Sequence, residues 1–403
     1  MKRTRVVRIA GVVAGLSLLT AACGGDDDDT STDDTEVDGG GGDATEYHIA
    51  YVGPLTGDAA NLGIFIRDGA KTAVEEFNES QDEIEIVLDE HDTQGDPAQA
   101  PTVAADYVND EDVLGIVGPA FSGETKAVVP TLEDAGLVMV SASATNVQLP
   151  DTVPDGKVFH RVLADDAAQA KGLVKYLTTT LKPATIAIVH DNSEYGQGLA
   201  VNELAAQLEG TDVEVVATEA IDPDSEDYSA AVNTVKGANP EAVFFAGYYE
   251  EAGTLAKQLR DEGVTATFIS ADGSLDPGFI DGAGEAAEGA QISCPCNLAT
   301  EASPGALGEF ATSYQEINGS EPGTYSTEAY DAANILIAGI VAGNTDRASL
   351  LEYVEGLTSV PDAISKDVSF APNGNIEAQG IFLFEVKGGE FVPLIATDDI
   401  PQP

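Results

Sequence analysis

The sequence has no tryptophan and little of several other residue types. In 403 residues there are three cysteines, two methionines and four histidines. Only 18 basic side chains stand against 70 acidic ones, and the formal net charge is −52. So few lysines and arginines exclude a nucleic-acid-binding protein, because phosphate contacts need clustered positive charge. The same shortage disfavours binding to an anionic membrane face.

Recognisable catalytic patterns are also lacking. The four histidines are scattered, and no His-Glu-x-x-His, Gly-x-Ser-x-Gly or phosphate-loop pattern occurs. The pairs His91-Asp92 and His190-Asp191 each end an apolar run, so a hydrolytic enzyme is the minor alternative, although such residues more often cap turns. We therefore expect no enzyme and no cofactor. We also expect no metal site, since no thiol has a nearby histidine partner.

The excess of acid has two interpretations. Ordinary solubility explains a charged surface without any special role. The alternative hypothesis is a protein that works in salty surroundings, where counterions screen its self-repulsion.

The first 46 residues read as export and tethering sequence. Residues 1–22 carry four basic residues, then an apolar run over 9–19 that is too short to span a membrane comfortably, and we interpret them as a signal peptide. Cys23 follows Thr-Ala-Ala and resembles the lipidated cysteine of a bacterial lipobox, although Thr20 departs from the usual leucine; an ordinary secretory signal is the alternative. Residues 23–46 are acidic and glycine-rich, which predicts a flexible linker.

From residue 47 onward, apolar runs alternate with amphipathic segments. This alternation predicts an α/β fold of parallel sheets flanked by helices. About ten strands are too many for one compact sheet, so two lobes are expected. The runs that we assign as strands cover residues 48–52, 84–88, 114–117, 137–140, 185–189, 213–216, 242–246, 267–270 and 290–293, followed by a hairpin over 380–386 and 390–395.

Polar residues collect where these strands end. Ser122 follows the strand over 114–117 and reads as the N-cap of a helix that ends near Gly136. Ser143 and Thr145 follow the next strand. Because ligands of open α/β sheets lie beyond the carboxyl ends of strands, where helix N-termini favour anions, these hydroxyls predict a carboxylate site.

The second half of the chain repeats the strand, turn and helix pattern with different chemistry. Tyr195 and Tyr248 stand at two strand ends, and Asp272 stands at a third. If the two halves face each other, they form a cleft suited to a zwitterion. The bland alternative is that the tyrosines are core aromatics and Asp272 is a turn residue beside Gly273.

Several motifs, in this order and spacing, resemble type I periplasmic substrate-binding proteins of the branched-chain amino-acid ABC transporter class, which are similar to leucine/isoleucine/valine-binding protein. They include Gly-Pro-Leu-Thr-Gly at 53–57, Asp-Thr-Gln-Gly-Asp-Pro at 92–97, Glu-Asp-Ala-Gly at 133–136 and Tyr-Asp-Ala at 330–332. The resemblance implies two lobes joined by three crossovers. It places the first lobe at 47–163 plus 297–366 and the second at 164–296 plus 367–403.

The resemblance also implies residue roles. The ligand's carboxylate is expected at Ser122 and Thr145, with backbone contacts at Ser143 and Ala144, and its ammonium at Asp272. Tyr195 and Tyr248 are expected to close over the ligand. The implied side-chain pocket is apolar and consists of Leu62, Ala120 and Phe121.

One further feature is a pair of closely spaced cysteines. Cys294-Pro295-Cys296 lies where a crossover is expected, and the two thiols are predicted either to form a disulfide or to be small buried side chains.

The resemblance implies a function as an extracytoplasmic lipoprotein, anchored to the membrane only through lipid on Cys23. Such a protein captures a small amino acid by hinge closure and delivers it to an ABC permease. The alternative is a ligand-sensing receptor for amino acids, amides or small carboxylates.

Overall fold

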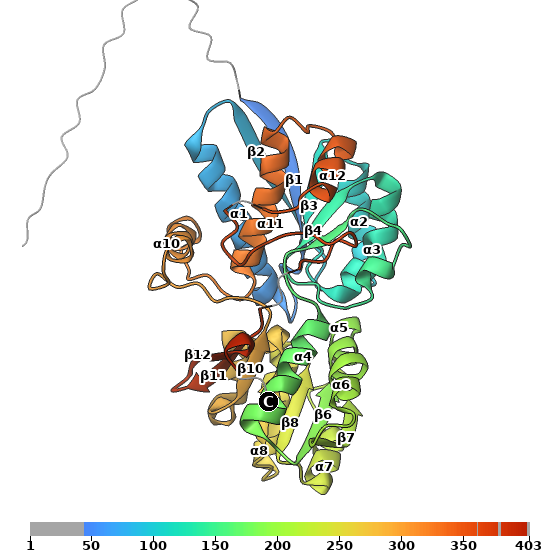
Figure 1. The fold of residues 1–403 in the computed structure, drawn as a ribbon, viewed down its shortest axis with the longest axis vertical. Helices are drawn as coiled ribbons and strands as arrows, with labels where there is room; N and C mark the ends of the chain where they lie inside the picture. Colours follow the sequence, from blue (N-terminus) through green and yellow to red (C-terminus); the bar gives the residue numbers. More distant parts are fainter. Residues whose placement is uncertain (1–43, 361, 378–379, 401–403) are drawn as a thin grey trace, which may run out of the picture. The chain divides into compact units, whose positions relative to one another are not determined.

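The fold contains two separate β-sheets, each covered by helices (Figure 1). The structure is a computed structural model and describes residues 44–360, 362–377 and 380–400. The predicted signal peptide, Cys23 and nearly all of the 23–46 linker lie outside the described residues. The first strand begins at Thr45, two residues before the predicted start of the folded body.

The first sheet is entirely parallel, with strand order β2-β1-β3-β4-β5. Its third strand is buried at every residue, as expected for a strand that is covered on both faces. The short edge strand β5 was not predicted, because Phe-His-Arg has no apolar run. The strands are β1 (Thr45–Gly53), β2 (Ile84–Asp92), β3 (Val113–Val117), β4 (Val138–Ser141) and β5 (Phe159–Arg161).

The second sheet has the order β12-β11-β10-β9-β8-β6-β7. Its five strands from β6 to β10 are parallel, and the C-terminal pair is antiparallel, which confirms the predicted hairpin. The strands are β6 (Thr185–His190), β7 (Glu214–Ala220), β8 (Ala242–Ala246), β9 (Thr267–Ser270), β10 (Gln291–Cys294), β11 (Phe382–Lys387) and β12 (Glu390–Ala396).

Helices cover both sheets because each has an apolar stripe that needs burial. In the first part α1 packs on α11 and α2 packs on α3, and in the second α7 and α9 pack on α8 (Figure 1). The α-helices are α1 (Ala60–Ser80), α2 (Ala100–Asn109), α3 (Ser122–Ala135), α4 (Asp166–Tyr176), α5 (Glu194–Gln197), α6 (Ala206–Leu208), α7 (Ser229–Ala238), α8 (Tyr249–Asp261), α9 (Pro277–Ala283), α10 (Ala306–Asn318), α11 (Ser326–Val341) and α12 (Arg347–Glu355). The π-helical segments η2 (Leu177–Leu181) and η3 (Gly198–Ala205) extend α4 and α5. No helix in the described ranges is both long enough and apolar enough to cross a membrane.

The chain passes between the two sheets three times. The first passage follows β5 and the second follows β10, where Cys294 and Cys296 form a disulfide. The third lies later than the expected position near Asp367, because the Arg161 N–H of β5 donates to Gly374 O at 3.0 Å. Residues 370–376 therefore still belong beside the first sheet, and the chain reaches the second sheet only at β11.

Candidate functional site

One small cavity lies where strand ends of both sheets meet. It encloses about 10 Å³, roughly the space of one water molecule. Its walls come from the loops after β3, β4, β6, β8 and β9, together with the residue that precedes α11. The lining residues are Phe121, Ser122, Ser143, Tyr195, Tyr248, Asp272, Gly273 and Tyr325.

Ser122 stands at the amino end of α3, on the side of the first sheet. It is the first residue of the helix and Phe121 is the N-cap, so the predicted N-cap was one residue late. Ser122 Oγ accepts a hydrogen bond from Asn146 N–H at 3.2 Å, which leaves its own O–H free to donate to a ligand. The α3 dipole favours an anion at the same place. The helix ends at Gly136, as predicted, where φ is 61°.

A buried carboxyl group holds the start of α3. Glu124 Oε2 accepts from the Phe121 N–H at 3.0 Å, and Thr93 Oγ1 donates to Glu124 Oε1. Burial raises the pKa of Glu124 to about 7, against the opposing hydrogen bonds from Thr93 and Phe121. Glu124 therefore fixes the orientation of the helix end that presents Ser122.

The other predicted carboxylate contacts follow β4. Ser143 Oγ donates to Ala120 O at 2.5 Å, so its hydroxyl hydrogen is already used and its side chain can only accept. Ala144 is fully buried, and its carbonyl accepts from Arg161 Nη1 at 3.0 Å. Thr145 is also fully buried and is not among the residues that line the cavity.

Asp272 supplies the negative charge on the side of the second sheet. Its Oδ1 accepts from Gln169 Nε2 at 2.7 Å and from Tyr195 Oη at 2.8 Å, and Tyr325 Oη donates to its Oδ2. Burial raises the pKa of Asp272, and the hydrogen bonds from Tyr325, Gln169 and Tyr195 oppose that rise. The three donors favour the ionised carboxylate, whereas burial favours the neutral acid.

Aromatic rings close the cavity from both sides. The Phe121 and Tyr248 ring centroids are 4.6 Å apart, and those of Tyr195 and Tyr248 are 5.6 Å apart. Since Phe121 belongs to the first sheet's loops and Tyr248 to the second's, the contact between these two tilted rings joins the two halves at the cavity.

Sequence reasoning missed two members of this group, Gln169 and Tyr325. Tyr325 precedes α11 in the left-handed conformation, with φ at 70°, and no local motif indicates that its hydroxyl reaches Asp272. Gln169 lies one turn along α4 from Asp166, a spacing that places both on one helix face and was the available signal.

Two of the three predicted side-chain pocket residues do not line the cavity. Leu62 on α1 and Ala120 after β3 are fully buried in the core, and only Phe121 lines the enclosed space. Ala120 packs close to β1, since a Cβ added at Gly53 would lie 2.8 Å from the Ala120 Cβ.

Polar contacts also connect the two halves around the cavity. Lys126 Nζ lies 2.8 Å from Glu194 Oε1, and Asn146 Nδ2 donates to Glu194 O at 2.6 Å. On another edge, Asn61 Nδ2 donates to Asp276 Oδ1 at 3.1 Å. Residues far apart in sequence therefore hold the strand ends of the two sheets together.

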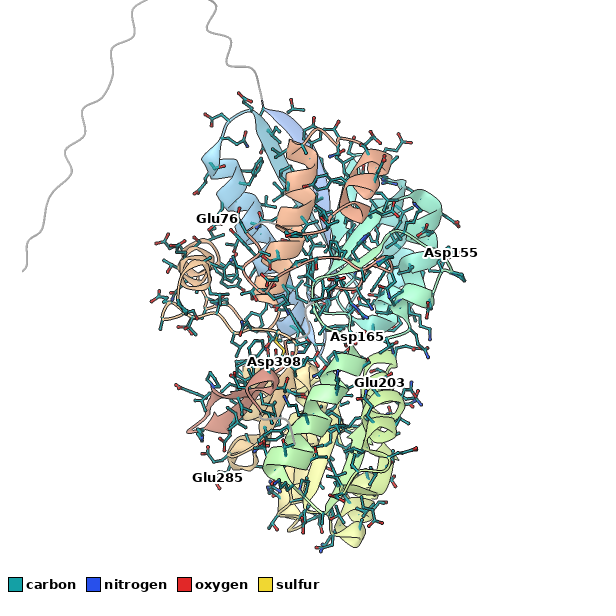
Figure 2. The ribbon with its side chains drawn as sticks, in the orientation of Figure 1. Glu76, Asp155, Asp165, Glu203, Glu285 and Asp398 are labelled. Carbon is teal, nitrogen blue, oxygen red and sulfur yellow. A yellow bond between two sulfur atoms is a disulfide. The ribbon has the colours of Figure 1, made fainter. Side chains whose placement is uncertain are left out.

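The acidic excess lies mainly away from this site. Figure 2 labels six acidic residues distributed over both parts of the fold, Glu76, Asp155, Asp165, Glu203, Glu285 and Asp398, and none of them is buried. In contrast, Asp272 is 1% exposed. The surface charge and the buried site charge are therefore separate features.

The described residues contain no assembled catalytic or metal-binding group. Ser122 Oγ contacts the Asn146 amide rather than a histidine, and His190 Nδ1 lies 3.1 Å from the Asn192 N–H. Within the same ranges no three His, Cys, Asp or Glu side chains are placed to hold a metal ion.

Comparison with known proteins identifies the family. Residues 46–390 match the family described as "Periplasmic binding protein". A Leu/Ile/Val-binding protein of Rhizobium johnstonii is 31% identical over 85% of this chain and 92% of its own length. A leucine-, isoleucine-, valine-, threonine- and alanine-binding protein of Pseudomonas aeruginosa is 30% identical, covering 77% of this chain and 82% of its own length.

Solved structures agree on the fold. The crystal structure of a leucine-binding protein from Thermotoga maritima superposes with a TM-score of 0.77 at 26% identity, covering 87% of this chain and 98% of its own. A branched-chain amino-acid transporter substrate-binding protein from Streptococcus pneumoniae, in complex with isoleucine, gives a TM-score of 0.78 at 24% identity over 87% of this chain and 99% of its own.

These relatives are binding proteins, so this chain is a binding protein and not an enzyme, and its periplasmic relatives indicate an extracytoplasmic location. The two sheets, the three passages between them and the match over residues 46–390 together show that the chain belongs to the periplasmic binding protein family, in the two-lobed type I form that the sequence predicted.

Proposed function

We propose that the protein captures a small zwitterionic amino acid, branched-chain or similar, between its two lobes. The observation that carries the proposal is the single cavity with Ser122 at a helix N-terminus on one side and Asp272 on the other. A carboxylate gains charge-assisted hydrogen bonds from the first, and an ammonium gains an ion pair with the second. The relatives named for leucine, isoleucine and valine binding support this ligand class.

The proposal requires the lobes to separate and close. A cavity of about 10 Å³ is far smaller than an amino acid, so a ligand fits only when the walls part. The bodies that move are residues 47–163 with 297–376, and residues 164–296 with the C-terminal hairpin. Ligand contacts both, and therefore favours the closed form by its differential affinity for closed over open.

We further infer that Cys23 carries a lipid and that the protein delivers its ligand to an ABC permease. The small residues before Cys23 and the acidic linker after it support anchoring with room to move. Replacing Cys23 by serine is expected to release the protein from the membrane fraction. Retention of the Cys23→Ser variant in that fraction would mean another anchor.

The direct test of the ligand is a thermal-shift screen of purified, ligand-stripped protein against the common amino acids, small amides and the matching des-amino carboxylates. We expect stabilisation by leucine, isoleucine or valine, then a Kd by calorimetry for each hit. If carboxylates without an ammonium stabilise as well as amino acids, or no amino acid does, the proposal is wrong. Uptake of the labelled ligand by cells with and without the gene tests delivery.

A further inference from the structure

Asp166 is a second buried carboxyl group next to the candidate site, and no role assigned above uses it. It is the first residue of α4, directly after the first passage between the sheets, and it is 0% exposed. Neither of its carboxyl oxygens has a hydrogen-bond partner among the described residues. This contrasts with Asp272, which accepts from three donors.

The polar side chain beside Asp166 is Thr145. The Asp166 N–H donates to Thr145 O at 2.9 Å, which fixes the two residues next to each other across the passage. Thr145 Oγ1 is also buried and has no partner in the described part of the chain. Both side chains are thus buried, adjacent through this backbone bond and without partners among the described residues, so a hydrogen bond between Thr145 Oγ1 and the Asp166 carboxyl group would satisfy both.

The surroundings of Asp166 favour its neutral form. A buried carboxylate without donors is costly, whereas a protonated carboxyl group needs only one acceptor. Burial raises the pKa of Asp166 well above its ordinary value; the Thr145 hydroxyl and Arg161 lower it, whereas Asp272 and Asp165 add to the rise. Arg161 Nη1 donates to Ala144 O and Asn146 O, and its Nη2 lies 3.4 Å from Asp165, which is labelled in Figure 2.

The two buried acids therefore have opposite environments. Tyr195 and Gln169 stabilise charge on Asp272, while no side chain or amide in the described part of the chain donates to the Asp166 carboxyl group. Burial raises the pKa of both groups, and the difference between them lies in the donors that contact Asp272. On the other side of Asp166, Gly198 allows close packing, since a Cβ there would meet Asn146 Nδ2 at 2.6 Å and Asp166 Oδ2 at 3.2 Å.

We propose that Asp166 is a positioning residue, held as the neutral acid, whose O–H donates to Thr145 Oγ1 and so directs the Thr145 hydroxyl hydrogen toward the ligand carboxylate. If the Thr145 oxygen accepts a hydrogen bond from Asp166, its own hydrogen remains able to donate to a ligand in the cleft. Ser122, whose Oγ already accepts from Asn146 N–H, is set up in the same way. The inference rests on the proposed function, because it assumes a ligand with a carboxylate.

The test compares Asp166→Asn, Asp166→Leu and Thr145→Val, with the double variant Thr145→Val/Asp166→Leu, by calorimetry with leucine. Asp166→Asn keeps a neutral donor of the same shape, so its Kd is expected to stay within about threefold of wild type. Asp166→Leu removes the donor and is expected to weaken binding about tenfold, the effect of one hydrogen bond to a charged group. In the Thr145→Val background the same change is expected to have no further effect.

Two results would overturn the inference: an Asp166→Asn variant as weak as Asp166→Leu, or fully additive losses in the double variant. If Asp166→Leu shows no cooperative thermal transition, Asp166→Ala takes its place, and a tenfold loss in a folded Asp166→Asn variant alone is enough to refute the neutral-donor role. A wild-type protein that binds no amino acid overturns the proposed function, and this inference with it.

Discussion

Asp272→Asn is the substitution that most directly tests the zwitterion site. It removes one negative charge from a side chain that is 1% exposed while keeping its size. The Asn Oδ1 can still accept from Gln169 and Tyr195, which donate to Asp272 Oδ1 at 2.7 and 2.8 Å. The new amide hydrogens can donate to the Tyr325 oxygen, so the local framework should persist.

The expected loss is therefore electrostatic. Removing one partner of a buried hydrogen-bonded charge pair costs about 2–5 kcal/mol. A loss of about 3 kcal/mol weakens the Kd for leucine roughly a hundredfold. The des-amino analogue 4-methylpentanoate has no ammonium, so its Kd should change by less than about threefold, or improve because the carboxylate no longer faces Asp272.

Calorimetry with both ligands, on the wild type and on the variant, measures the ratio of the Kd for leucine to the Kd for 4-methylpentanoate. Asp331→Asn is the matched control, because Asp331 is also a buried carboxyl group that accepts from several donors, at Ile364 and Ser365, but does not line the cavity. The control should change the melting temperature without changing the ratio of the two affinities. Equal losses for leucine and 4-methylpentanoate in Asp272→Asn would refute the assignment of the ammonium to this residue.

Three other outcomes are expected. Ser122→Ala should weaken leucine and 4-methylpentanoate alike, by about tenfold, since it removes one hydrogen bond to the shared carboxylate; unchanged calorimetric affinity would remove Ser122 from the site. Burial raises the pKa of Glu124 from 4.5 to about 7, so the folded state holds this proton while the unfolded state releases it, and stability falls as pH rises through that window. In Glu124→Gln, the free energy of unfolding measured with denaturant should depend less on pH between pH 5 and 7 than in the wild type. An unchanged pH dependence in the variant would contradict the assignment of this effect to Glu124. If self-repulsion of the net charge of −52 limits stability, the melting temperature should rise as salt increases from about 0.1 to about 1 M, where the Debye length falls from about 10 to about 3 Å; a flat series favours simple solubility.

Much of the fold could be predicted from local sequence pattern, and the errors have physical causes. Apolar runs and turn residues are local signals, and they located most strands to within a few residues. The strand β5 was missed because its own residues, Phe-His-Arg, form no apolar run. Its identity as a strand comes from its pairing with β4. The third passage was placed too early because the contact of Gly374 with Arg161 joins residues more than two hundred positions apart.

The candidate site was predictable to the extent that it follows strand ends. Ser122, Tyr195, Tyr248 and Asp272 each directly follow a strand or its turn, and all four line the cavity. Leu62, Ala120, Ala144 and Thr145 are buried and do not line it, because which side chains reach the cavity depends on how the loops pack and not on position in sequence.

The sequence by itself determined the α/β alternation, the division into two sheets and the chemistry available at each strand end, since these follow from periodicity and residue type. Only the tertiary structure decided which strand ends meet. It brought Tyr325 and Gln169 to Asp272, gave Asp272 three donors and, within the residues that the structure describes, left the Asp166 carboxyl group with none. Whether a buried carboxyl group is charged depends on these long-range neighbours, which no local stretch of the chain specifies.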